Sequence, residues 1–257
     1  MVNIAFRPKK YIIPSTVEEA VDVLGKYEGR ALPVAGGSDV MVDKDSGVEA
    51  LVDITRLGLS YVRKENDGLH IGACTTMSEI AAEPQLGDSP YTLLSDAASM
   101  VGSPQIRNIA TIGGNVVKPS PCADLVPPLS VLKAKIVIAG ASGQRSLDIG
   151  ELISGVKRDT LGQDELITEF IIPEYDDSWR SSFMKKGRVA VADLALVNVA
   201  VCLRMDNDNR CSEARITLGA VAPVPVRAEK AEKALSGKVI DADIAREAGR
   251  IASTEIS

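Results

Sequence analysis

The chain has 257 residues, of which 45% are hydrophobic and 25% charged, and its formal net charge is −6 at pH 7. This composition is ordinary for a globular protein, and the length suffices for one large or two modest domains. The negative balance gives no basic surface for nucleic acid or for an anionic membrane. No apolar run reaches the roughly 18 residues of a membrane span. Residues 1–10 also lack the apolar core of a signal peptide, so we expect a cytoplasmic protein.

The N-terminal part of the sequence predicts one helix and several short strands. Ser15 and Glu18 fit a capping box that opens a helix ending near Gly29. Asn66-Asp67-Gly68 between two apolar runs is typical of a β-hairpin. Strands are predicted at residues 31–34, 50–54, 59–63 and 69–73.

The remaining elements predict an α+β fold. Helices are expected at residues 78–82, 91–101 and 124–134, and strands at 135–139 and 166–172. The polar run 173–178 breaks both periodicities and predicts a domain boundary. Beyond it, strands within 181–185, 194–205 and 215–221 predict an antiparallel sheet, followed by helices at 226–235 and 241–254.

The sequence offers few groups for metal or nucleophilic chemistry. Its four cysteines contain no C-x-x-C pair, so neither zinc nor an iron–sulfur cluster is supported, and free buried thiols are expected. His70 is the single histidine, and its alternation with apolar neighbours predicts a place on the polar face of a strand. We therefore expect no metal ligands and no catalytic residue.

Two glycine pairs are the strongest indication of a ligand. Gly36-Gly37 follows the apolar run 31–34, and Gly113-Gly114 follows the run 106–110. A backbone without Cβ atoms can approach a ligand closely, and its successive N–H groups can form a concavity for an anion. Either pair alone also fits an ordinary tight turn. The two pairs together favour a ligand with two phosphates.

Residues 102–115, which read GSPQIRNIATIGGN, and 120–127, which read SPCADLVP, resemble the flavin subunits of molybdenum hydroxylases. That family includes the medium subunit of carbon monoxide dehydrogenases and the FAD domain of xanthine dehydrogenases. Three further stretches agree in order: PSTVEEA at 14–20, AGGSD at 35–39, and the segment from Lys185 to Ala200. The similarity covers nearly the whole chain.

The resemblance implies both a fold and a cofactor. It implies an FAD-binding domain of the PCMH type at residues 1–175, with subdomains of about 1–56 and 57–175. A C-terminal domain at 176–257 is expected to hold a three-stranded antiparallel sheet with helices. Because relatives continue further, this domain is expected to be cut short. FAD is expected to be bound without a covalent link.

The resemblance also implies which residues contact FAD. The two glycine loops are expected to hold its pyrophosphate through backbone N–H groups, Asp124 to contact the ribose, and Lys185 to lie near the flavin. Asp124 also fits a helix N-cap, and Lys185 a solvated lysine on a strand. The expected FAD-binding residues are Pro33, Val34, Ala35, Gly36, Gly37, Ser38, Asp39, Val40, Val101, Thr111, Ile112, Gly113, Gly114, Asn115, Asp124, Ile167 and Lys185.

By the same resemblance, the chain is expected to transfer electrons within a larger complex. A large molybdopterin subunit would hydroxylate the substrate, and a small subunit with two [2Fe–2S] clusters would carry electrons to FAD. FAD accepts single electrons and would pass a pair to NAD⁺, a quinone or another acceptor. A dimer of heterotrimers is expected. A free-standing FAD oxidoreductase of the same fold group is one alternative, and an interaction module that has lost FAD is another.

Overall fold

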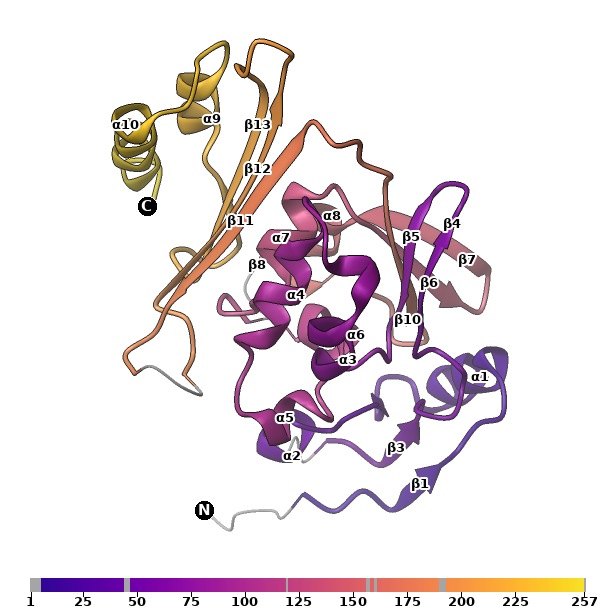
Figure 1. Ribbon diagram of the computed structural model, residues 1–257. Coiled ribbons are helices and arrows are strands. Elements are labelled where there is room, and N and C mark those ends of the chain that lie inside the picture. The colour runs from indigo at the N-terminus through magenta and orange to yellow at the C-terminus, as the bar shows by residue number, and fades with distance from the viewer. Residues whose placement is uncertain are drawn as a thin grey trace.

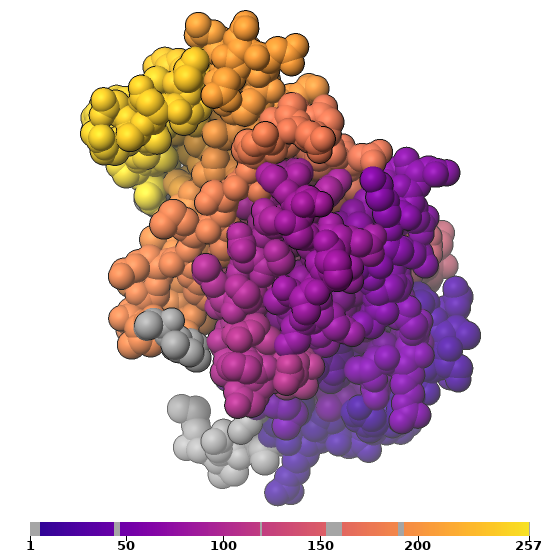
Figure 2. Space-filling view, in the orientation of Figure 1, coloured from indigo at the N-terminus to yellow at the C-terminus, as the bar shows by residue number. Residues whose placement is uncertain are grey.

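The computed structural model describes residues 6–43, 47–118, 120–155, 158–159, 161–189 and 193–256. A small parallel sheet is followed along the chain by a five-stranded sheet with helices, and then by a second antiparallel sheet with two helices (Figure 1). This arrangement confirms the expected α+β class. The C-terminal sheet and helices form a lobe beside the larger body of the molecule (Figure 2). Among the described residues, no helix is long and apolar enough to cross a membrane.

The N-terminal part is a three-stranded parallel sheet with one covering helix. Its strands lie in the order β1 (Lys10–Ile12), β3 (Ala50–Asp53) and β2 (Ala31–Val34). The helix α1 (Val17–Tyr27) packs its buried residues Ala20 and Leu24 in one cluster with the strand residues. β2 leads directly into the first glycine loop, so this sheet positions that loop.

The cap of α1 differs by one residue from the predicted Ser15–Glu18 pair. Thr16 accepts the backbone N–H of Glu19 at 3.1 Å, and the Glu19 carboxylate accepts the N–H of Ser15 at 2.7 Å. The shift follows from the helix itself: because Val17 is the first helical residue, Thr16 occupies the N-cap and Glu19 the third helical position.

The middle of the chain folds into a five-stranded antiparallel sheet covered by helices. Its strands lie in the order β4 (Val62–Glu65), β5 (Gly68–Gly72), β10 (Leu166–Ile172), β6 (Lys135–Gly140) and β7 (Gly143–Asp148). The main helices are α3 (Met77–Ala82), α4 (Thr92–Ser99), α6 (Ile112–Val117) and α7 (Val126–Val131). Apolar side chains of these helices and of β5, β6 and β10 form one buried cluster, in which Phe170 is fully buried.

Short elements fill the connections of these two parts. They are α2 (Val40–Asp43), η1 (Pro84–Leu86), α5 (Pro104–Arg107), α8 (Ile149–Leu152), β8 (Ile153–Gly155) and β9 (Arg158–Asp159). The helix α2 follows the first glycine pair, and α5 precedes the second pair, which lies within α6.

The C-terminal sheet has four strands where three were expected. The three long ones are β11 (Trp179–Lys186), β12 (Val197–Met205) and β13 (Cys211–Gly219), and the fourth is β14 (Val226–Arg227). β14 pairs with the end of β13 through only two residues. Pro223 and Pro225 precede it, and proline is typical of sheet edges, so the sequence shows no alternating run there. The helices α9 (Glu229–Leu235) and α10 (Ala242–Ser253) follow.

The two faces of the C-terminal sheet pack against different parts of the molecule. Trp179, Phe183 and Cys202 on the inner face belong to the buried cluster of the five-stranded sheet and its helices. Ile216 and Leu218 on the outer face pack in a separate cluster with α9 and α10. The main core is therefore continuous across the polar segment 173–178.

His70 is buried rather than placed on an open polar face. It lies on β5, between β4 and β10, and is 5% exposed. Its Nε2 lies 2.8 Å from Asp67 Oδ1, and its Nδ1 lies 3.0 Å from Glu169 Oε1 on β10, without hydrogen-bond geometry. Charged side chains of the neighbouring strands cover the ring. This explains why His70 is buried although the sequence pattern predicted polar surroundings for it.

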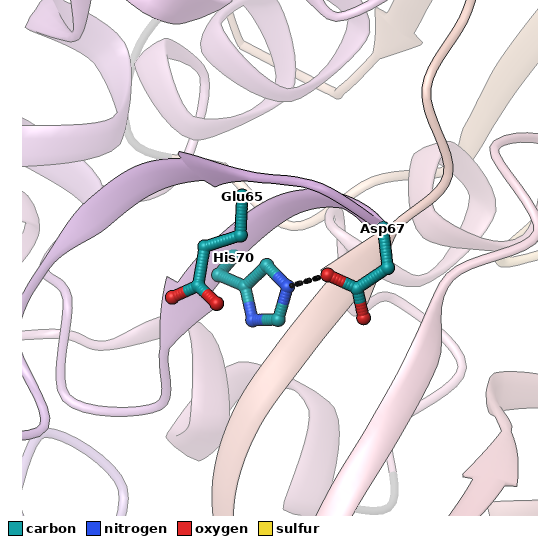
Figure 3. Close-up of side chains that lie close together, drawn as sticks. All are labelled: Glu65, Asp67 and His70. Carbon is teal, nitrogen blue, oxygen red and sulfur yellow. Dashed lines mark hydrogen bonds and ion pairs between the residues drawn. The ribbon is translucent and has the colours of Figure 1, made fainter.

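Glu65, Asp67 and His70 are close enough to one another to share a metal ion. Glu65 and Asp67 lie on opposite sides of the imidazole ring (Figure 3). Glu65 forms an ion pair with Arg63 at 2.6 Å, while Asp67 holds Nε2 of His70. These contacts make the group an ion-pair cluster centred on the histidine.

The His70 cluster predicts a pH-dependent contribution to stability. Burial lowers the pKa of His70, but the hydrogen bond to Asp67 and the Glu169 carboxylate outweigh burial and raise the pKa overall. Protonated His70 therefore stabilises the fold fully below the unfolded-state pKa of about 6.5. That contribution is lost as pH rises through the folded-state pKa.

We expect the free energy of unfolding of the wild-type chain, relative to His70→Gln, to fall as pH rises through this window. Urea unfolding of both proteins from about pH 5.5 to about pH 9 measures the difference. Other titrating groups cancel because both proteins contain them. A difference that stays constant over the whole range would contradict the prediction.

Candidate functional site

The structure brings the two glycine loops together around one cavity. This cavity, called the loop cavity below, has a volume of about 410 Å³ and lies between residues 33–40 and 110–118. The expected residues that line it are Pro33, Ala35, Gly36, Gly37, Ser38, Asp39, Val40, Val101, Thr111, Gly114 and Asn115. Most of the expected FAD-binding set therefore faces one space.

The first glycine loop offers unpaired backbone donors. Gly37 has a φ of 67°, in the left-handed region that favours glycine. Among the described residues, no acceptor pairs with the backbone N–H groups of Gly36, Gly37, Ser38 and Asp39. Consecutive free N–H groups at a tight turn are the arrangement that binds phosphate oxygens.

The second glycine pair is the first turn of α6 rather than a separate loop. Thr111 is the N-cap and accepts the N–H of Gly114 at 3.2 Å through its hydroxyl. The N–H of Ile112 donates to Thr75 O at 3.0 Å, and that of Gly113 donates to Ala73 O at 2.9 Å. These N–H groups are already paired within the protein, which differs from the expectation that both glycine loops present free donors.

Two of the glycines are needed for contact between protein segments. A Cβ at Gly36 would overlap the carbonyl oxygen of Ile109, and a Cβ at Gly113 would lie 2.7 Å from Ala73 O. The space that the sequence assigned to a ligand is thus filled by backbone at both positions. A larger side chain there would separate the segments that form the cavity, so loss of ligand and loss of folding could not be told apart.

Lys118 is a cavity residue that the sequence analysis missed. It follows α6 directly, forms an ion pair with Asp43, and lies 3.9 Å from Asp39. Within the described part of the chain, it is the one cationic residue that lines the loop cavity. Its closeness in sequence to Gly113-Gly114 was the available signal. The other missed lining residues are Phe6, Leu32, Asp43, Val48, Ile106, Ala110 and Val117.

Asp124 and Lys185 form a buried ion pair and do not line the loop cavity. Lys185 Nζ donates to Asp124 Oδ2 at 2.6 Å and to Met100 O at 3.0 Å, and Asn198 Nδ2 donates to Asp124 Oδ1 at 2.9 Å. Burial raises the pKa of Asp124, although Lys185 and Asn198 oppose this by stabilising the charged carboxylate. Both oxygens of Asp124 are thus engaged by protein groups.

The geometry of this ion pair excludes two alternatives that the sequence left open, a helix N-cap for Asp124 and a solvated lysine for Lys185. Asp124 is not a helix N-cap, because Leu125 occupies that position of α7. Lys185 is not solvated, because its side chain is only 8% exposed. Asn115 adds a link to the loop cavity, since its Oδ1 accepts the N–H of Leu125 at 3.2 Å while its amide nitrogen has no acceptor among the described residues.

Six expected residues do not line the loop cavity: Gly113, Asp124 and Lys185, described above, and Val34, Ile112 and Ile167. Ile112 is fully buried and Ile167 is 3% exposed, and both belong to the main buried cluster. Ile167 lies on β10 opposite Ile138 of β6, which places it inside the sheet layer. Val34 ends β2, where its carbonyl accepts the N–H of Ile54 at 3.0 Å. These residues support the cavity from behind.

A second cavity adjoins the first at the turn of residues 101–102. Val101 lines the loop cavity, and Gly102 lines this second space of about 520 Å³. We call it the cation-lined cavity, because its lining includes Arg107, Lys185, Lys186 and Arg188. The guanidinium of Arg107 donates to Val101 O at 3.0 Å, which fixes the turn between the two cavities.

Comparison with known proteins assigns the chain to a family. Residues 4–175 match the family described as "FAD binding domain in molybdopterin dehydrogenase", and residues 182–257 match "CO dehydrogenase flavoprotein C-terminal domain". The chain belongs to this flavoprotein family. It is therefore the FAD-binding subunit of an oxidoreductase of the molybdenum hydroxylase type, as the sequence resemblance predicted.

The names of similar proteins agree with this family assignment. The nicotinate dehydrogenase FAD-subunit of Eubacterium barkeri is 32% identical over 238 residues, covering 89% of this chain and 79% of the relative. The carbon monoxide dehydrogenase medium chain of Hydrogenophaga pseudoflava is 31% identical over 234 residues, covering 89% of this chain and 80% of the relative.

Solved structures of the flavoprotein family share the fold. The carbon monoxide dehydrogenase of Hydrogenophaga pseudoflava matches with a TM-score of 0.91 and 29% identity, covering 98% of this chain and 88% of that one. Quinoline 2-oxidoreductase from Pseudomonas putida 86 matches with a TM-score of 0.88 and 27% identity, covering 96% and 86% of the two chains.

The Asp124–Lys185 pair predicts a large and specific stability effect. Lys185→Met would leave the Asp124 carboxylate buried without its cation, and we expect a loss of about 3 kcal/mol or more in the free energy of unfolding. The matched control is Lys186→Met, the next residue on β11, which is exposed and should change stability by less than about 0.5 kcal/mol. Urea unfolding measures both. Equal effects of the two substitutions would show that the pair adds nothing.

Proposed function

We propose that this chain carries FAD in the loop cavity and transfers electrons within a molybdenum hydroxylase complex. The observation that carries the proposal is the run of unpaired N–H groups from Gly36 to Asp39, which faces a cavity beside Lys118. Free backbone donors next to a cation suit a diphosphate, which needs many hydrogen bonds and a positive charge.

The residues around the loop cavity supply distinct contacts for this cofactor. The first glycine loop would donate to the phosphates, Lys118 would balance their charge, and the free amide of Asn115 would donate a further hydrogen bond. No cysteine or histidine among the described residues lines the loop cavity, which favours non-covalent binding. When bound, FAD supplies one- and two-electron redox chemistry that no side chain here provides.

The remaining expected residues act in this proposal as supports of the site. Val34, Ile112, Gly113 and Ile167 hold the loops from behind. Lys185 lines the cation-lined cavity and is held by Asp124 and by Met100 O, so the pair would fix the wall of that cavity next to the turn at residues 101–102. We also propose two domains, at residues 1–175 and 176–257, the first with subdomains of about 1–56 and 57–175.

We further propose the partners and the electron path. An iron–sulfur subunit would deliver electrons to FAD, and a molybdopterin subunit would oxidise the organic substrate, with two such trimers in each complex. The names of the relatives support a multi-subunit assembly, since two of them are called medium chain and FAD-subunit. The acceptor would be NAD⁺, a quinone or another carrier. A cytoplasmic location is supported by four free cysteines, which are typical of a reducing compartment.

The loop cavity predicts that FAD retention depends on the charge of Lys118. Lys118→Glu would place a third carboxylate beside Asp39 and Asp43 and repel the diphosphate, so we expect FAD affinity to fall at least about tenfold. Lys118→Arg, which keeps the charge, should retain FAD. Lys230→Glu makes the same charge change on α9 and is the remote control.

The measurement is the molar ratio of flavin to protein after gel filtration, with release of the flavin by denaturation. Full flavin content in Lys118→Glu would remove Lys118 from the site. A wild-type chain that takes up no FAD would overturn the proposed function itself, and flavin that stays with the denatured chain would contradict non-covalent binding.

The proposed partnership predicts what accompanies the chain in its native source. Native pull-down and mass spectrometry should recover an iron–sulfur subunit and a molybdopterin subunit, with iron and molybdenum in the complex. The isolated chain should oxidise no organic substrate, because in the proposed complex that oxidation belongs to the molybdopterin subunit. Recovery of a lone chain that turns over an organic substrate unaided would favour the free-standing oxidoreductase.

A further inference from the structure

A third and larger cavity lies between the C-terminal sheet and the five-stranded part of the molecule. It has a volume of about 630 Å³ and is lined by β13, β14 and α9 on one side and by α7, β6 and α8 on the other. We call it the Arg215 cavity. It shares no lining residue with the loop cavity, so nothing in the proposed function accounts for it.

Arg215 is buried in the wall of this cavity and held in a fixed orientation. Its residue is 7% exposed, and its guanidinium lies over the Trp179 ring at 4.3 Å. Its Nε donates to Glu213 Oε1 at 2.8 Å, and its Nη1 donates to Val131 O at 3.0 Å and to the Tyr175 hydroxyl at 2.8 Å. A rigidly held guanidinium loses little entropy when it binds another group.

One nitrogen of this guanidinium remains available to a ligand. Nη2 of Arg215 has no acceptor among the described residues and is not fully buried, and Arg215 lines the cavity. The hydroxyl of Thr217 is in the same state. Arg215 and Thr217 lie two residues apart on β13, so both point from the inner face of the sheet.

The charges around the cavity favour an anion. Lys133, Lys135, Arg215 and Arg227 line it, against two carboxylates, Asp148 and Glu232. Glu232 pairs with Arg227 at 2.9 Å, and Glu213, outside the lining, pairs with Arg215 at 2.8 Å and with Lys133 at 3.4 Å. The four cations therefore exceed these three carboxylates by one positive charge.

Most of the remaining lining is apolar. Val126, Ile149, Val224 and Pro225 contribute walls that offer no hydrogen bond from their side chains. A cavity of this size, with apolar walls and a few convergent polar groups, is typical of small-molecule sites, which also occur preferentially between domains. A guanidinium with a free N–H matches a carboxylate oxygen, and apolar walls match a hydrocarbon body.

We propose that the Arg215 cavity binds a small organic acid, with its carboxylate on Arg215 and Thr217 and its apolar body against Val126 and Ile149. A ligand there contacts both the C-terminal sheet and the five-stranded part, so it would stabilise their packing by binding only the folded chain. The proposal does not depend on FAD.

Isothermal titration of the full-length chain with benzoate tests the proposal, with benzamide and inorganic phosphate as comparison probes. Benzoate should bind saturably below about 10 mM. Benzamide, which lacks the charge, and phosphate, which lacks the apolar body, should each bind at least about tenfold more weakly. Absence of saturable benzoate binding, or equal binding of either comparison probe, would overturn it.

Variants locate the site. Gly150 lines the cavity, and a Cβ there meets nothing within 4 Å, so Gly150→Leu should obstruct the cavity without strain and weaken benzoate binding at least about tenfold. Gly249→Leu is the matched control, because Gly249 on α10 is equally open and lies outside this cavity. Arg215→Lys should also weaken binding, provided that circular dichroism shows it folded. Wild-type affinity in Gly150→Leu would place the ligand elsewhere and contradict the proposal.

Discussion

The buried ion pair of Asp124 and Lys185 is the contact on which the arrangement of the site depends. A carboxylate in the interior is costly unless it is paired and hydrogen-bonded, and here Lys185 of β11 and Asn198 of β12 supply both needs. The same lysine also binds the Met100 carbonyl, next to the turn that separates the two cavities near the glycine loops. One set of polar contacts thereby fixes the C-terminal sheet, α7 and the cavity wall relative to one another.

The loop cavity depends on a second constraint, the close approach of backbone segments. Gly36 lies against the Ile109 carbonyl, and Gly113 lies against Ala73, so the segments that carry the two glycine pairs are locked together before any ligand is considered. The free N–H groups of the first glycine loop are a consequence of this packing. They occur where β2 has ended and α2 has not begun, so neither ladder nor helix can pair them.

Much of this could be predicted from the sequence, because local patterns determine it. The apolar runs of β2, β3 and β10 and the amphipathic α1 are close to their predicted bounds, and the segments that carry the glycine pairs line one cavity. The polar strand β7 has no apolar alternation and exists through pairing with β6, which only tertiary structure supplies. The pairing of the Gly113 N–H with Ala73 and the burial of Lys185 likewise depend on distant segments.

The inner face of the C-terminal sheet limits how proteins of this family can exchange domains. Trp179, Phe183, Ala200 and Cys202 complete a core whose other buried members come from helices and strands before residue 173. A chimera that joins the N-terminal part of this chain to the C-terminal part of a relative would have to match those side chains in volume, because close-packed interiors accommodate little change. Exchange of modules between family members is therefore restricted to pairs whose inner faces fit, and the outer face on α9 and α10 is where sequence can drift more independently.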